Sequence, residues 1–184
     1  MRVIAGRYKG RKLKPPAWEG LRPTSDKLRE TLFNILAPRL EGARVCDGYA
    51  GTGAVGIEAL SRGAAHVVFV DSDRRATAAI AGTAEAWGVG AVYTIHVGDA
   101  VEWLRRLADG PRFDLILLDP PYSLPQLREA LDAAAGCLSD EGLLVLERAT
   151  RREPDDVESL ERVRDLRAGD STLTFYRRSS DEFC

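Results

Sequence analysis

The chain has 184 residues, enough for one domain with a sizeable hydrophobic core and a short appendage, but too few for two domains with separate cores. With 45% hydrophobic and 29% charged residues, its composition argues against collagen-like, coiled-coil and disordered proteins. Its three cysteines form no Cys-x-x-Cys pair, and no apolar stretch reaches the roughly 18 residues of a membrane span. We therefore expect a cytoplasmic protein with no metal site and no membrane segment.

The net charge of −2 is distributed unevenly along the chain. The first forty residues contain ten basic and three acidic side chains, a net charge of +7, which leaves −9 for the rest of the chain. Such asymmetry is typical of a basic segment that binds nucleic acid or a membrane surface. A solvated basic face is the alternative that charge alone leaves open.

The first forty residues contain signals for a hairpin and a helix. Glycines interrupt short apolar and basic runs and predict a hairpin over residues 1–14. Thr24 or Ser25 then fits the N-cap position of an amphipathic helix that Pro38 closes. This pair of elements forms an appendage that leads into the main domain.

From residue 43 onward, apolar strand-like runs alternate with helical stretches. Strands that are apolar on both faces and separated by helices form a parallel sheet covered on each side. The predicted strands are 43–46, 67–70, 92–97, 113–118 and 143–146, and the predicted helices are 53–62, 73–87, 100–108 and 124–138.

The end of the chain departs from this alternation. Two further strands, 163–167 and 172–176, are joined by a tight turn and predict an antiparallel edge. The expected fold is thus α/β and Rossmann-like, with a mostly parallel seven-stranded sheet and an antiparallel C-terminal hairpin. The chain divides into a basic appendage (1–40), a main domain (41–178) and a loose tail (179–184).

A glycine-rich loop follows the first predicted strand. Gly51-Thr52-Gly53-Ala54-Val55-Gly56 matches the dinucleotide fingerprint, and Asp71 lies twenty residues after Gly51, which by itself suggests NAD. Asp47, however, precedes the loop where a pyrophosphate would bind and would repel that anion. S-adenosylmethionine fits better because it carries an ammonium and a sulfonium and has no phosphate. A tight turn with close helix packing is the purely structural alternative.

An aspartate follows each of the first four predicted strands, and the carboxyl ends of parallel strands share one rim of the sheet. Asp71 is placed to accept hydrogen bonds from ribose hydroxyls. Asp99 is placed to accept one from the adenine amino group, with the Ala100 amide near a ring nitrogen. The candidate cofactor-binding residues are Asp47, Tyr49, Gly51, Gly53, Asp71, Ser72, Asp99 and Ala100.

Asp119-Pro120-Pro121-Tyr122 directly follows the fourth predicted strand. An exocyclic amine of a nucleobase is a poor nucleophile because its lone pair is delocalised into the ring. The Asp119 carboxylate and the Pro120 carbonyl can accept both amine hydrogens and direct the lone pair at a methyl sulfonium. Tyr122 offers a face for base stacking. We take Asp119, Pro120 and Tyr122 as candidate catalytic residues, with an ordinary turn after a strand as the alternative.

These motifs resemble those of the bacterial 16S rRNA guanine-N2 methyltransferases of the RsmD type, a family of class I S-adenosylmethionine-dependent methyltransferases. The Asp-Pro-Pro-Tyr element is shared with DNA-adenine and other amino methyltransferases and indicates the reaction type. The stretches Arg22-Pro23-Thr24 and Glu58-Ala59-Leu60-Ser61-Arg62-Gly63 point to this family. The resemblance runs from Arg2 to about Arg178; Gly48-Tyr49 and the tail depart from it.

The resemblance implies methyl transfer to the N2 amine of one guanine in 16S rRNA, within the 30S subunit or its assembly intermediate. We expect the enzyme to be a monomer. A methyltransferase acting on adenine N6 in DNA or on another amine remains an alternative. A third possible function is that of an NAD-dependent oxidoreductase or a non-catalytic RNA-binding module. The candidate substrate-binding residues include four in the hairpin that could contact RNA phosphates: Arg7, Lys9, Arg11 and Lys12. They also include Arg22, Thr24 and Arg29, which could close over cofactor or substrate, with helix capping and surface pairing with Asp26 or Glu30 as alternatives.

Overall fold

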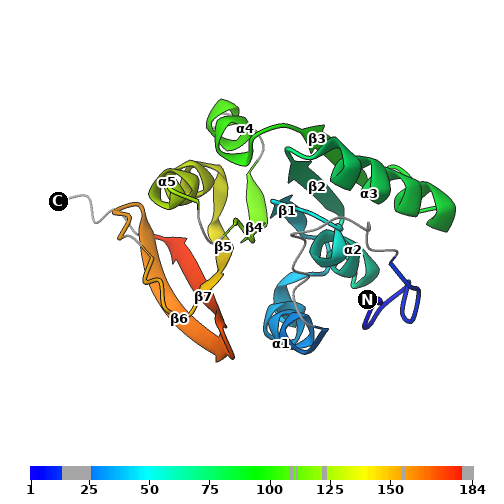
Figure 1. The fold of residues 1–184 in the computed structure, drawn as a ribbon, viewed down its shortest axis with the longest axis horizontal. Coiled ribbons are helices and arrows are strands. Elements are labelled where there is room, and N and C mark those ends of the chain that lie inside the picture. The colour runs from blue at the N-terminus through cyan, green and yellow to red at the C-terminus, as the bar shows by residue number, and fades with distance from the viewer. Residues whose placement is uncertain (14–25, 108–109, 111, 122–123, 155, 180–184) are drawn as a thin grey trace.

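The computed structural model describes residues 1–13, 26–107, 110, 112–121, 124–154 and 156–179. In this part of the chain a seven-stranded sheet has the strand order β3-β2-β1-β4-β5-β7-β6 (Figure 1). The first five strands are parallel, and β7 is antiparallel to both β5 and β6. The predicted α/β sheet with an antiparallel C-terminal edge is therefore confirmed. The strands are β1 Arg44–Gly48, β2 His66–Asp71, β3 Tyr93–Val97, β4 Phe113–Leu118, β5 Leu138–Ala149, β6 Leu160–Ala168 and β7 Ser171–Arg178.

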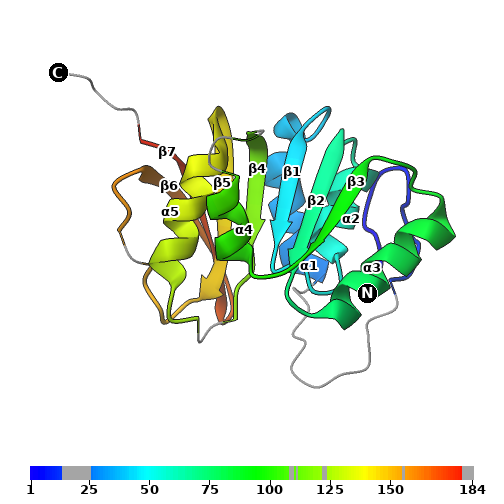
Figure 2. The same ribbon diagram turned by 90° about the horizontal axis from the view of Figure 1, so that it is seen from above.

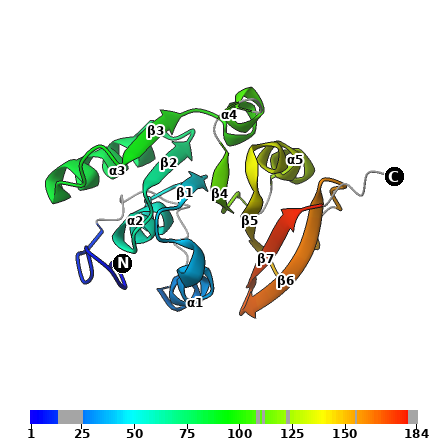
Figure 3. The ribbon, with the colours of Figure 1, turned by 180° about the vertical axis from the view of Figure 1, so that it is seen from behind.

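Helices cover both faces of this sheet, because its central strands are buried on both sides. Side chains of α1, α2 and α3 pack into one apolar cluster and those of α4 and α5 into the other. Figure 3 shows α1 and α2 on one side of the sheet and α4 and α5 on the opposite side. The helices are α1 Asp26–Leu36, the 3₁₀ helix η1 Ala37–Arg39, α2 Ala54–Ser61, α3 Arg74–Trp87, α4 Ala100–Arg106 and α5 Leu127–Cys137.

Most differences from the predicted elements lie at their ends. Strand β1 continues to Gly48, so Asp47 lies within the strand and not after it. Strand β5 begins directly after α5 and is 12 residues long; Leu138 pairs with Phe113, and a register shift then precedes the pairing of Leu143 with Leu115. Pro38 lies inside η1, after α1 has ended at Leu36. The expected caps Thr24 and Ser25 lie outside the described residues.

Residues 1–13, which we call the N-terminal strap, form a looser hairpin than predicted. A single antiparallel bridge joins Arg2 to Lys12, and the Val3 amide donates to the Arg11 carbonyl at 3.0 Å. The strap lies beside α2 and α3 (Figure 2). None of the helices in the described ranges is long and apolar enough to cross a lipid bilayer.

Candidate active site

Asp47 connects β1 to the start of α2 beneath the glycine loop. Its buried Oδ2 accepts a hydrogen bond from the Gly56 amide at 2.8 Å. Gly56 must lack a side chain here, because a Cβ would lie 2.2 Å from the Phe69 ring and 2.9 Å from the Asp47 carboxylate. The loop thus turns tightly over the end of the sheet, and Gly53 enters α2 with a φ of 71°.

Burial raises the pKa of Asp47 to about 8, and the neighbouring Asp71 carboxylate adds to this effect. The hydrogen bond from the Gly56 amide opposes the shift but does not cancel it. The Asp47 carboxyl is therefore mostly protonated at neutral pH when no cation is nearby. A positively charged ligand beside Asp47 would lower its pKa and favour the carboxylate that the sequence suggested.

Asp71 ends β2 and holds two loops together. Its Oδ2 accepts from the Gly51 amide at 2.7 Å, and its Oδ1 accepts from the Asp73 amide at 2.8 Å. Each carboxylate oxygen keeps a second lone pair, so these bonds leave acceptor capacity for a ligand hydroxyl. Ser72, between the two acids, is exposed. Asp71 therefore fixes the geometry of the glycine loop from the neighbouring strand.

Tyr49 has a strained backbone and an unsatisfied hydroxyl. Its φ is 61°, a left-handed conformation that is unusual for a tyrosine. Its hydroxyl is buried and has no hydrogen-bond partner among the described residues. Burial, with a smaller effect of the nearby Asp99, raises the pKa of Tyr49 to about 12. Asp99 is exposed and caps α4, where its Oδ1 accepts from the Glu102 amide at 2.9 Å, and Ala100 is buried beside it.

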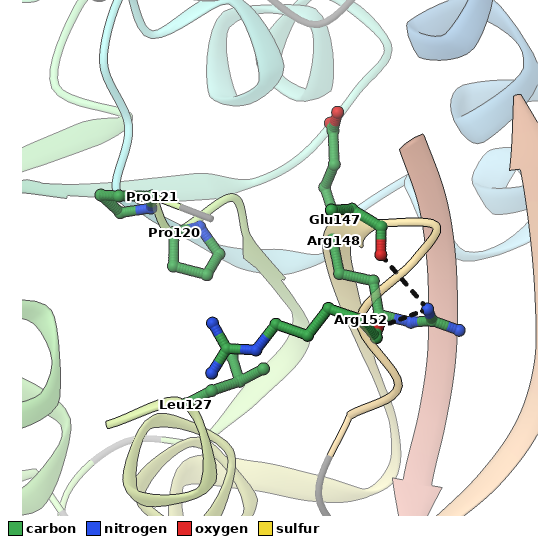
Figure 4. Close-up of a pocket in the computed structure, with 7 residues that line it drawn as sticks. Pro120, Pro121, Leu127, Glu147, Arg148 and Arg152 are labelled. Atoms are coloured by element: carbon green, nitrogen blue, oxygen red, sulfur yellow. Dashed lines mark hydrogen bonds between the residues drawn. The ribbon is translucent and has the colours of Figure 1, made fainter. Parts of the chain in front are cut away.

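The Asp-Pro-Pro segment lies next to this loop. The Asp119 amide donates to the Gly48 carbonyl at 3.4 Å, so the end of β4 is tied to the end of β1. Pro120 is buried and Pro121 is exposed, whereas Tyr122 lies outside the described residues. Figure 4 shows a small pocket beside the two prolines. Its lining also includes Leu127, Glu147, Arg148, Ala149 and Arg152.

The basic residues of the N-terminal strap differ in their surroundings. Arg7, Lys9 and Lys12 are exposed. The Arg11 guanidinium lies over the rings of Tyr8 and Trp87, at 5.4 and 5.5 Å, and donates to the Trp87 carbonyl. Arg11 therefore anchors the strap on α3. Lys9, Lys12 and Arg7 keep exposed surface, although the Arg7 guanidinium also lies 5.6 Å from the centre of the Tyr8 ring.

Arg29 has no exposed surface. Its Nη2 donates to the Arg2 carbonyl and to Asp26 at 3.0 Å, which joins the strap to α1. Its Nε and Nη1 have no hydrogen-bond partner in the described part of the chain, and burial lowers the pKa of the guanidinium. In this position Arg29 holds the strap to α1 and does not face solvent. Arg22 and Thr24, its predicted companions, lie outside the described residues.

Two structural features near the site were missed by sequence reasoning. Glu58 on α2 is completely buried and accepts from the Ile4 and Ala5 amides at 2.8 and 3.0 Å. Ser61, one turn on, accepts from the Tyr8 amide at 2.9 Å. An acid inside an apolar helical stretch was the available signal for Glu58. The second feature is Glu147, which lines the pocket beside Pro120.

Comparison with known proteins assigns the fold and site to a family. The family described as "Conserved hypothetical protein 95" matches residues 1–177. This chain belongs to that family, the RsmD type of methyltransferase. "Ribosomal RNA small subunit methyltransferase D" of Escherichia coli K12 is 36% identical over 149 residues, covering 80% of this chain and 74% of the relative. YlbH of Bacillus subtilis strain 168 is 35% identical over 182 residues, covering 97% of this chain and 99% of the relative.

A solved structure agrees with this assignment. The yhhF protein of Escherichia coli is 32% identical, covers 98% of this chain and 99% of its own, and superimposes with a TM-score of 0.86. The expectation of an RsmD-type class I methyltransferase is thus confirmed, and the NAD-dependent oxidoreductase is set aside. In the described ranges this methyltransferase has no group of three or more His, Cys, Asp or Glu side chains that could hold a metal ion.

The site of this methyltransferase fits S-adenosylmethionine, the cofactor of its class. The unsatisfied Tyr49 hydroxyl needs a polar partner at the strand ends, which a bound ligand would supply. Asp71 and Asp99 offer carboxylate oxygens for hydroxyl and amine donors. Asp47 offers a carboxyl that ionises when a cation binds. We propose Asp47, Tyr49, Gly51, Gly53, Asp71, Ser72, Asp99 and Ala100 as the residues that would hold it.

The raised pKa of Asp47 predicts how the stability of the methyltransferase depends on pH. Between the unfolded pKa, near 3.8, and the folded pKa, about 8, the native state binds more protons than the unfolded chain. The free energy of unfolding therefore falls as pH rises through this window and levels off above it. In Asp47→Asn this contribution is absent, so the decline between pH 5 and 8 is expected to shrink by about 2 to 4 kcal/mol.

Urea unfolding at pH 5 and pH 8 measures this difference. Asp132→Asn, at an exposed position on α5, serves as the control and should reproduce the wild-type decline. Equal declines for wild type and Asp47→Asn would show that the Asp47 carboxyl ionises normally in the folded protein.

Proposed function

We propose that this enzyme transfers the methyl group of S-adenosylmethionine to the exocyclic N2 amine of a guanine in 16S rRNA. The observation that carries the proposal is the Asp119 amide bond to the Gly48 carbonyl, because it brings the amine-accepting segment beside the glycine loop. The Escherichia coli relative is named for methylation of small-subunit ribosomal RNA, which supports rRNA as the substrate.

The chemistry assigned to the chain's residues is positioning and charge stabilisation. The cofactor would supply an electrophilic methyl group; its S–CH3 bond breaks as the N–C bond forms, and it leaves as the neutral thioether S-adenosylhomocysteine. The Asp119 carboxylate accepts one amine hydrogen and the Pro120 carbonyl the other, which draws the nitrogen toward a tetrahedral shape and aims its lone pair. The new N–C bond leaves the nitrogen positively charged, and Asp119 stabilises that charge. Loss of one proton to Asp119 or to water then gives the neutral methylated amine.

The substrate is expected to be an unstacked guanine in the 30S subunit or its assembly intermediate, acted on by a monomer in the cytoplasm. Unstacking costs least in a loop or single strand. Tyr122 is proposed to stack on the extruded base, and Arg22 and Thr24 to contact the RNA. The division into appendage 1–40, catalytic domain 41–178 and tail 179–184 stays a proposal of the same kind.

Mass mapping of the modified nucleotide tests the proposed function. Wild-type enzyme, S-adenosylmethionine and 30S particles that lack the modification should yield one N2-methylguanine in 16S rRNA. Naked 16S rRNA and duplex DNA are run in parallel. Methylation of adenine, or of DNA in preference to both RNA substrates, would favour the alternative amino methyltransferase. Absence of methyl transfer to any substrate would contradict the proposal.

The three exposed cations of the strap predict the strength of RNA binding. Replacing Arg7, Lys9 and Lys12 together with glutamine should weaken binding to 30S particles about tenfold or more and reduce the slope of log K against log [salt] by about 2, because each phosphate contact contributes about 0.7. Binding titrations over a series of salt concentrations measure both quantities, and calorimetry should show unchanged cofactor affinity. Arg11 is left in place because it holds the strap on α3.

A matched triple variant controls for loss of charge. Arg105, Arg106 and Arg128 are exposed on α4 and α5, on the opposite face of the sheet from α2. Their replacement by glutamine should reduce the slope of log K against log [salt] by less than half of the reduction expected for the strap variant. Equal slopes for the two variants would mean that the strap is a solvated basic face.

A further inference from the structure

The catalytic segment contains two prolines and therefore has few amide hydrogens with which to hold itself in place. Pro120 and Pro121 have no backbone N–H, so neither can donate to the neighbouring strands. The Asp119 amide donates to the Gly48 carbonyl and fixes the start of the segment. The proposed mechanism leaves the Pro120 carbonyl to the substrate amine. A donor from another part of the chain is therefore needed to hold the far end of the segment.

Arg152 supplies such a donor. Its Nη2 donates to the Leu124 carbonyl at 2.9 Å. The Leu124 amide in turn donates to the Pro121 carbonyl at 2.8 Å, so Leu124 is fixed relative to the two prolines. Arg152 also lines the pocket beside these prolines, and Figure 4 shows its side chain extending toward Leu127 and the prolines. Arg152 therefore joins the chain that follows β5 to the end of the catalytic segment.

The backbone of Arg152 is fixed by the buried Arg148. Arg148 Nη1 donates to the Arg152 carbonyl at 2.7 Å, and the Arg152 amide donates to the Ala149 carbonyl at 3.0 Å. The Arg148 guanidinium also donates to Thr174 Oγ1 on β7 at 2.9 Å and to Asp165 on β6 at 3.0 Å. The C-terminal strands thus fix the position from which the Arg152 side chain reaches the catalytic segment.

We propose that Arg152 is a positioning residue for methyl transfer. By holding the Leu124 carbonyl, it keeps the Asp119 carboxylate and the Pro120 carbonyl where they accept the two amine hydrogens. Reaction rates are sensitive to such placement, because a displacement of about 1 Å can cost about 100-fold in rate. This inference rests on the proposed roles of Asp119 and Pro120, but it does not depend on which amine is methylated.

Arg152→Met tests this role because it keeps the apolar stem of the side chain and removes the donor. The single-turnover rate constant at saturating 30S particles should fall by about 10- to 100-fold. Cofactor affinity, particle affinity and the midpoint of thermal unfolding should stay close to wild type, because Arg148 holds the Arg152 backbone and not its side chain. Arg152→Lys can still donate one hydrogen bond to the Leu124 carbonyl, and its rate constant should fall by about fivefold or less.

Arg151→Met is the matched control. Arg151 is exposed and directly precedes Arg152 in the chain. Its replacement removes the same charge from the same part of the surface and should leave the rate constant at saturation unchanged. Hydrogen exchange gives a second measurement that needs no substrate. The Leu124 amide should exchange about five- to tenfold faster in Arg152→Met than in wild type or Arg151→Met.

The outcomes separate this inference from the proposed function. A slow Arg152→Met that Arg152→Lys largely restores, with normal affinities, would support the positioning role. A wild-type rate constant in Arg152→Met, or unchanged exchange of the Leu124 amide, would overturn it. Weaker particle binding with a wild-type rate constant at saturation would make Arg152 an RNA contact instead. An adenine or DNA product from the wild-type enzyme would overturn only the guanine-N2 function, and the same comparison on that substrate would still decide the role of Arg152.

Discussion

Asp119→Ala is expected to reduce the rate of methyl transfer by about 100- to 1000-fold, the usual effect of removing one preorganised electrostatic group from a transition state. Without the carboxylate, one amine hydrogen loses its acceptor and the positive charge that develops on the nitrogen loses its counterion. The glycine loop should keep its place, because the bond that ties it to this segment comes from the Asp119 backbone. Cofactor affinity should therefore stay within about twofold of wild type.

Single-turnover methylation of 30S particles measures this rate, and calorimetry measures cofactor binding. Asp119→Asn should lie between wild type and alanine, because its carboxamide oxygen still accepts one hydrogen bond but carries no charge. Asp132→Ala, at an exposed position on α5, should behave as wild type. Full activity in Asp119→Ala would contradict the assigned mechanism, and equal loss of rate and cofactor affinity would reassign Asp119 to cofactor binding.

The sheet and its rim were predictable because their signals are local. Apolar runs gave the strands to within a few residues, and the alternation with helices made the first five parallel. The acids at Asp71, Asp99 and Asp119 then had to lie at one edge, and the structure places them there. Asp47 was placed at the same edge, but its burial and the raised pKa that follows from it depend on tertiary packing, which no local pattern contains.

The contacts of the N-terminal strap were not predictable, because they join residues 27 to 76 positions apart. Charge suggested that Arg11 and Arg29 contact RNA, yet both hold the strap to the domain. Tyr8 similarly stood among basic residues and is 4% exposed, with its ring 5.9 Å from that of Trp87. Charge shows that a segment is basic but does not distinguish the cations that anchor it from those that face solvent.

Glu58→Ala is expected to lower the free energy of unfolding by about 3 to 5 kcal/mol, the range observed when one partner of a buried ion pair is removed. Glu58 accepts from two strap amides and from Arg62 Nε at 2.7 Å. Without it, these donors are left unsatisfied in a region closed to water. Urea unfolding measures the stability, and hydrogen exchange of the Ile4 and Ala5 amides reports whether the strap stays docked.

Gly6→Ala provides an independent way to release the strap. Gly6 has a φ of 81°, and a Cβ there would lie 1.8 Å from the Ser61 carbonyl oxygen. Glu58→Ala and Gly6→Ala should therefore both release the strap from α2. Binding to 30S particles should weaken, because the exposed cations of the strap would no longer be held in one arrangement. Glu85→Ala, at an exposed acid on α3, should change stability by less than about 0.5 kcal/mol. Weakened RNA binding with full strap protection would contradict the link between strap docking and RNA binding.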